Sequence, residues 1–211
     1  MSEKFSLSEE QQRFLLREAR DTLESVVRGG DVVIYETDDP LLRKKMGVFV
    51  TLNKVSGGVR RLRGCIGYPS AIKPLYIATP EMARAAALED PRFPPVSPEE
   101  THEIEIEISV LSPWKVVKEK GEVVDLDELV SRIKVGRDGL ILFKGPYSGL
   151  LLPQVPVEWG WDEEEFLVEL TRKAGIPEAL LGNAGEVLTS PETEIYSFEA
   201  FVFSESDLSG G

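Results

Sequence analysis

The sequence predicts an α+β fold in which antiparallel sheets and helices form two lobes. Alternating apolar and polar residues mark strands, and apolar residues at helical spacing mark the helices between them. Both halves of the chain give the order helix, hairpin, helix, strand, so an internal α-β-β-α-β duplication is one hypothesis. No residues match between the halves, and chance recurrence of this order in an α+β chain is the alternative.

The elements of the first half follow from local signals. Ser6 and Ser8 each begin a capping box ahead of a helical pattern that Gly29 and Gly30 end. Strands are expected over 46–53 and 59–66 as a hairpin, a helix opening at Thr79 and Pro80 through residue 88, and a strand over 104–110 whose glutamates face water.

The second half is expected to contain a weak helix over 125–133 and a hairpin of 140–143 with 149–152. Asp162 and Glu165 cap a helix that ends at Gly175, and the last strand is expected over 195–203. We therefore predict a single domain over 1–204 made of two subdomains, about 1–117 and 118–204, with a boundary that can be discontinuous. Residues 205–211 are predicted to be a flexible tail.

Composition excludes several classes of function. The 211 residues carry a net charge of −13, and Arg60, Arg61 and Arg63 form the only dense basic patch, which argues against nucleic acid as a partner. One cysteine and one histidine exclude an internal disulfide, zinc ribbons and multi-histidine sites, so we expect no metal and no cofactor. We expect a cytoplasmic protein with no signal peptide and no membrane span.

The most unusual segment is Leu-Arg-Gly-Cys-Ile-Gly at 62–67. With it the chain resembles the AMMECR family, and the resemblance extends from the first helix to the last strand. Further matches are Asp-Pro-Arg-Phe-Pro-Pro at 90–95, Gly-Leu-Leu-Leu-Pro-Gln-Val-Pro at 149–156, Gly-Trp-Asp at 160–162 and Lys-Ala-Gly at 173–175.

The resemblance implies two subdomains of unequal size with a cleft between them as the candidate active site. It implies no established activity, although roles in transcription, replication, repair or translation are suggested for the family. Members often carry a second cysteine at the position where this chain has Thr171. A cysteine pair is therefore excluded here.

Cys65 is the candidate nucleophile. Gly64 and Gly67 would allow a sharp bend and a close ligand, and Arg61 and Arg63 are expected to lower the pKa of the thiol. Arg63 shares a face with Cys65 by strand alternation, whereas Arg61 does so only without a bulge. The alternative is a small buried thiol at the end of a hairpin, and His102, the only histidine, is as readily a solvated surface residue as a catalytic base.

Two proline-rich segments have structural and functional alternatives. Arg92 either pairs with a carboxylate to fix the corner that Pro91 starts, or holds a carboxylate or phosphate of a ligand. The segment 153–161 either lines a groove or is a stiff connection. We expect Trp161 to staple the following helix and leave Trp159 as a candidate contact site.

Two functional hypotheses follow. In the first, a small anionic ligand binds in the cleft with Cys65 as a candidate nucleophile, and the binding residues are Arg63, Gly64, Ile66, Gly67, Asp90, Arg92, Phe93, Pro153, Gln154 and Lys173. In the second, the protein is an interaction module without chemistry that uses Trp159 or a proline-rich surface to bind another protein. Whether a reaction is catalysed, the identity of the ligand and the oligomeric state do not follow from the sequence.

Overall fold

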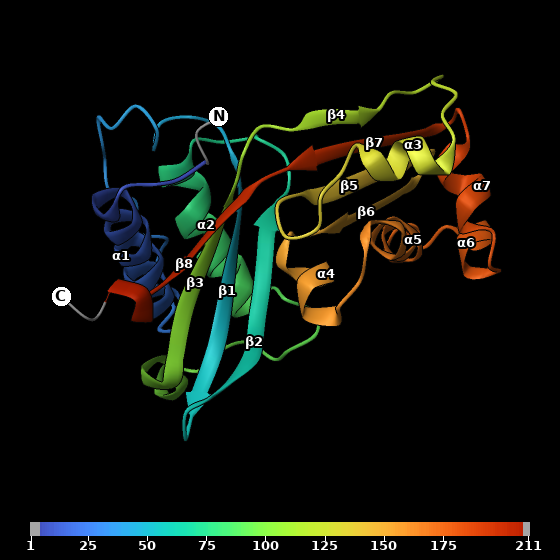
Figure 1. Cartoon of the computed structure of the whole chain (residues 1–211). Helices are drawn as coiled ribbons and strands as arrows, with labels where there is room; N and C mark the ends of the chain where they lie inside the picture. Colours follow the sequence, from blue (N-terminus) through green and yellow to red (C-terminus); the bar gives the residue numbers. More distant parts are fainter. Residues whose placement is uncertain (1–4, 209–211) are drawn as a thin grey trace. The chain divides into compact units, whose positions relative to one another are not determined.

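Two units make up the chain in the computed structural model, which describes residues 5–208 (Figure 1). Residues 5–112 with 201–208 form the first unit, and residues 113–200 form the second. The first unit is therefore discontinuous, and its boundaries lie at 112/113 and 200/201, where the sequence predicts one at 117/118. No helix within the described residues is both long and apolar enough to cross a membrane.

The first unit contains two long helices and one sheet. Its elements are α1 Glu9–Val26, β1 Gly47–Ser56, β2 Val59–Tyr68, α2 Leu75–Leu88, the 3₁₀ helix η1 Pro98–Glu103, β3 Ile104–Leu111, β8 Ala200–Ser204 and η2 Ser206–Leu208. The second unit contains β4 Lys115–Lys118, α3 Leu126–Ser131, β5 Gly139–Lys144, β6 Tyr147–Leu151, α4 Gln154–Trp159, α5 Glu163–Lys173, α6 Pro177–Leu180, α7 Ala184–Thr189 and β7 Thr193–Phe198. The predicted α+β class with antiparallel sheets is confirmed.

The two four-stranded sheets have the same strand order. The first is β2-β1-β3-β8 and the second is β6-β5-β7-β4, so each has a hairpin, then the strand that follows the next helices, then a fourth strand. The fourth strands are exchanged between the halves, because β4 follows β3 in the chain but pairs with β7, whereas β8 follows β7 but joins β3. This equivalent topology supports the hypothesis of an internal duplication.

The core of the first unit lies between its sheet and its helices. Val48, Val50 and Leu52 alternate along β1 toward the buried face, and α1 and α2 cover that face in Figure 1. The second unit has a separate core in which α5 packs on β5 and β6 around Phe166 and Leu170. The expected alternation of burial is present in β3 from Ile104 to Ile108, but Ser109, expected on the wet face, is buried.

Two predicted boundaries are wrong. The helix α2 begins at Leu75 rather than at Thr79, because Pro74 precedes it and the Leu75 amide donates to the Lys44 carbonyl. Pro80 therefore lies inside the helix. The strand expected over 195–203 is two strands, β7 and β8, which belong to different sheets.

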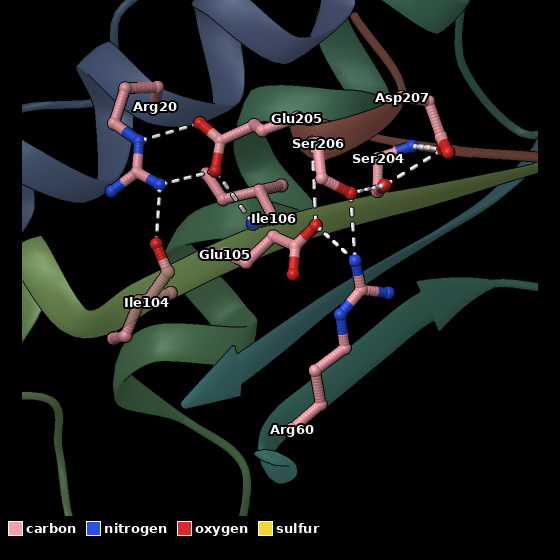
Figure 2. A network of polar contacts seen from close by, with 9 residues as sticks. All are labelled: Arg20, Arg60, Ile104, Glu105, Ile106, Ser204, Glu205, Ser206 and Asp207. Atoms are coloured by element: carbon pink, nitrogen blue, oxygen red, sulfur yellow. Dashed lines mark hydrogen bonds and ion pairs between the residues drawn. The ribbon is translucent and has the colours of Figure 1, made fainter. Parts of the chain in front are cut away.

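The carboxylate of Glu205 fixes the end of β8 to the first unit, although the sequence assigns it to a flexible tail. It forms an ion pair with Arg20 of α1 and accepts a hydrogen bond from the Ile106 amide at 2.8 Å (Figure 2). Beside it, Arg60 donates to both Glu105 and Ser206. These contacts hold η2, and residues 209–211 of the predicted tail lie outside the described residues.

Glu18 of α1 is a fully buried carboxyl group. One oxygen accepts from the Tyr35 amide at 2.7 Å, and no described residue offers the other a hydrogen bond. Burial raises the pKa of Glu18 from 4.5 to about 8. The folded state therefore holds this proton more tightly than the unfolded chain does, so stability is lost as the pH rises from the unfolded pKa through the folded one.

Replacing Glu18 by glutamine is expected to remove this loss, because the amide resembles the protonated acid in shape and charge. At pH 9 the variant should be more stable than wild type by about 2 kcal/mol. This value is smaller than the full pKa shift would give, because the protein relaxes around the charged carboxylate. Urea unfolding at pH 5 and pH 9 measures it. Equal pH dependence in both proteins would show that Glu18 titrates normally.

Candidate functional site

The segment 62–67 occupies the second half of β2, where the strand pairs with β1. The register passes from Leu52 opposite Gly64 to Asn53 opposite Leu62, so Arg63 has no partner in the ladder and forms a bulge. A bulge turns the side chains on either side of it relative to simple alternation. The bulge thus removes Arg61 from the row of Cys65, which the sequence allowed only for a strand without a bulge.

Arg63 is buried and is held by η1 and by the loop that precedes it. Its guanidinium pairs with Glu100 through bonds of 3.1 and 3.0 Å and donates to the carbonyls of Pro94 and Pro95. The Arg63 side chain holds the pKa of Glu100 down at about 2. Arg63 therefore fixes the path of the chain after Phe93, and four of its five N–H donors are already bonded.

The two glycines that flank Cys65 are packed against the protein's own atoms. A Cβ at Gly64 would lie 2.2 Å from the Ala86 carbonyl oxygen of α2. A Cβ at Gly67 would lie 2.3 Å from the ring of Phe49. The absence of a Cβ at these two glycines thus allows α2 and the Phe49 ring to pack closely, rather than leaving space for a ligand as the sequence suggested.

Cys65 is partly buried and lies on a row with Thr51 of β1 and Glu107 of β3. The Thr51 hydroxyl donates to its Sγ at 3.2 Å. Burial raises the pKa of the Cys65 thiol, and Asp90 and Glu107 add to this, against the lowering effects of Thr51 and Arg92. The expected lowering of this pKa by Arg61 and Arg63 is therefore wrong.

Asp90 lies at the exit of α2 and is the central acceptor of the site. Its side chain is 2% exposed, and it accepts from the Cys65 amide at 2.8 Å. The Arg92 guanidinium meets both carboxylate oxygens, with Nε 2.9 Å from Oδ1 and Nη2 2.7 Å from Oδ2. This hydrogen-bonded pairing with Arg92 holds the pKa of Asp90 far below its usual range.

Arg92 is held on one side and exposed on the other. Besides Asp90, its Nη2 donates to the Cys65 carbonyl at 3.2 Å, and the guanidinium lies 5.5 Å from the centre of the Phe93 ring. The side chain is still 54% exposed. Within residues 5–208 nothing accepts a hydrogen bond from Nη1, so two N–H groups are fixed in direction and open to a ligand.

The structure brings Asp90, Arg92 and Phe93 together with the 63–67 segment in the first unit. Pro153, Gln154 and Lys173 belong to the second unit, where Gln154 begins α4 and Lys173 ends α5. His102 lies at the surface in η1, as the sequence predicts for the solvated alternative.

Thr171 is buried and donates to the Val168 carbonyl within its own helix. Across the described part of the chain, no three histidine, cysteine or carboxylate side chains gather in a group that could hold a metal ion.

Comparison with known proteins agrees with the resemblance in the sequence. The model of the AMMECR1 family matches residues 16–203. The chain belongs to the AMMECR1 family. It is 49% identical over 203 residues to a protein of Thermococcus gammatolerans, covering 95% of this chain and 93% of that one. It is 47% identical to Protein MK0488 of Methanopyrus kandleri, over all of this chain and 95% of the relative.

A solved structure is also similar. The crystal structure of the uncharacterised protein PH0010 from Pyrococcus horikoshii matches with a TM-score of 0.80 at 46% identity, covering 95% of this chain and 94% of that one. The similarity extends over nearly the whole fold, which agrees with the α+β architecture expected from the family.

Sequence reasoning missed two residues of this AMMECR1 site. Thr51 contacts Cys65 from the facing strand, and its position depends on the bulge that shifts the register. Glu100 holds Arg63, and a signal for it was present, because Ser97 and Glu100 have the spacing of a capping box and form one.

Proposed function

We propose that this AMMECR1 protein binds a small anionic ligand, a carboxylate or a phosphate, at the outer edge of Arg92 beside Cys65. The observation that carries the proposal is the orientation of the guanidinium, which Asp90 and the Cys65 carbonyl fix while Nη1 stays open. An arginine already held in place loses little side-chain freedom when it binds, and its planar donors suit carboxylate and phosphate oxygens.

Arg92 supplies the donors for the anion, which is the functional alternative that the sequence offers for this residue. Arg63 is already paired with Glu100, and its guanidinium fixes the loop that carries Phe93. Glu107 lies one strand beyond Thr51 on the face of Cys65, so the surface carries both signs of charge. Binding therefore depends on the directed donors of Arg92 rather than on a broad positive field.

The nucleophilic role of Cys65 stays a prediction. A thiol whose pKa is raised by burial is protonated at neutral pH, and the protonated thiol is a poor nucleophile. In the proposed site, Cys65 contributes its carbonyl to Arg92 and its neutral thiol to the wall beside the ligand.

Titration with inorganic phosphate and with acetate tests the proposal, with the amide shift of Cys65 as the readout in a ¹⁵N-labelled protein. Replacing Arg92 by glutamine is expected to weaken binding about tenfold or more, because one charged hydrogen-bonding group is lost. Arg13→Gln is the matched control, since Arg13 is 51% exposed and also pairs with a carboxylate.

Two results would contradict the proposal. One is Arg92→Gln protein that binds phosphate and acetate as tightly as wild type. The other is an Arg13→Gln variant that loses as much affinity as Arg92→Gln, which would mean that the anions respond only to net charge.

A further inference from the structure

Two tryptophans of the second unit form a stacked pair at its surface. The rings of Trp159 and Trp161 lie 6.0 Å apart and 19° from parallel. Gly160 makes this arrangement, because its left-handed conformation (φ 70°) ends α4 and turns the chain directly into the Asp162 cap of α5. Trp161 packs against the core of the unit, so Trp159 is supported from one side.

Trp159 is largely exposed to solvent, although it stacks on Trp161. Its exposed fraction is 71%, and Val157 in the same helix is 58% exposed. A large aromatic ring on a fixed backbone loses little freedom when it contacts a partner, and such residues dominate the binding energy of interfaces. The helix α4 thus presents an apolar contact surface that the described chain leaves uncovered.

An acidic groove of about 280 Å³ begins at Trp161 and follows α5. Four carboxylates and one guanidinium line it, and the residues are Trp161, Asp162, Glu164, Glu165, Val168, Glu169 and Arg172. Arg172 is paired with Glu169, so it does not cancel the remaining charge. Glu164 is exposed, and no hydrogen bond joins its carboxylate to a side chain within residues 5–208.

Aromatic faces and carboxylates side by side recognise cations. A guanidinium can lie on an indole face while it donates to a carboxylate, and desolvation strengthens both contacts. The exposed Val157 and Trp159 also require apolar contact, which a small inorganic cation does not supply. The complementary partner is therefore a peptide segment in which arginines alternate with apolar residues.

We propose that the Trp159–Trp161 pair and the acidic groove along α5 form a docking surface for an arginine-containing segment of another protein. This surface lies in the second unit and uses none of the residues of the anion site in the first. A result that contradicts one of the two proposals therefore does not contradict the other.

The test uses the full chain and two fluorescein-labelled nonapeptides, one with three arginines and two leucines among glycine and serine, and one with glutamate in place of arginine. Fluorescence anisotropy gives the affinities at physiological salt. The arginine peptide should bind, Trp159→Ala should weaken it about tenfold, and Glu164→Gln about threefold.

Glu186→Gln is the matched control, because Glu186 is an exposed carboxylate in the first turn of another helix of the same unit. It should leave the affinity unchanged. Trp159 is at the surface, so circular dichroism should show that Trp159→Ala folds normally. Equal binding of the glutamate peptide, wild-type affinity in Trp159→Ala, or equal losses in Glu164→Gln and Glu186→Gln would each overturn the proposal.

Discussion

Replacing Gly64 by alanine is expected to destabilise the first unit by about 3 kcal/mol, the upper end of the usual cost of overpacking. The added Cβ would lie 2.2 Å from the Ala86 oxygen and 3.1 Å from its carbonyl carbon. Both neighbours are backbone atoms, so no side-chain rotation relieves the clash. Either β2 or α2 must move, and with it the amide of Cys65 that bonds Asp90.

Gly185→Ala is the control for this prediction. Gly185 lies in α7 with an ordinary helical backbone, and nothing lies within 4 Å of an added Cβ. Alanine favours a helix over glycine by about 0.5–1 kcal/mol, so this variant should be slightly more stable than wild type. Urea unfolding of both variants measures the difference. A loss of stability below about 1 kcal/mol in Gly64→Ala would mean that β2 and α2 do not pack tightly against each other.

Replacing Asp90 by alanine is expected to cost about 3 kcal/mol, because it removes a buried carboxylate that accepts several hydrogen bonds, two of them from a guanidinium. The change leaves the Cys65 amide without its acceptor and frees the Arg92 guanidinium. Arg92→Ala should also destabilise the first unit, because it leaves the Asp90 carboxylate, 2% exposed, without its charged partner. In Asp90→Ala the anion site should also be lost, since the direction of Nη1 is no longer fixed.

The lowered pKa of Asp90 also predicts that the stability of the protein depends on pH. Its pKa is far below the usual range in the folded state, so its stabilisation is complete above the unfolded pKa of 3.8 and is lost as the pH falls below it. Asp90→Asn should lose less stability than wild type between pH 6 and pH 3, as measured by urea unfolding. Equal losses of stability in the two proteins would show that another carboxylate causes the destabilisation at low pH.

Elements governed by neighbouring residues were predictable from the sequence. The capping boxes at Ser8 and Asp162 form as expected, because each depends only on residues three positions apart. The β1–β2 hairpin follows from the two glycines of its turn, both with positive φ. Family membership followed from the 62–67 segment and is confirmed by the family match.

Features that depend on distant contacts were not predictable. The bulge at Arg63 is set by β1 and by the loop of Pro94, about 30 residues away. The pKa of Cys65 follows burial and Asp90, whereas the sequence drew attention to the adjacent arginines. The exchange of β4 and β8 left no local signal, because a strand's sequence does not state which sheet it joins.

The central claim is that Arg92 holds an anion beside a protonated Cys65, and the rate of Cys65 alkylation tests it most directly. The chain has one cysteine, so iodoacetamide reports on this site alone. The rate midpoint should lie above the value of about 8.5 for free cysteine. Phosphate should slow the reaction in wild type but not in Arg92→Gln. A midpoint at or below that of free cysteine, with no effect of phosphate in either protein, would contradict the claim.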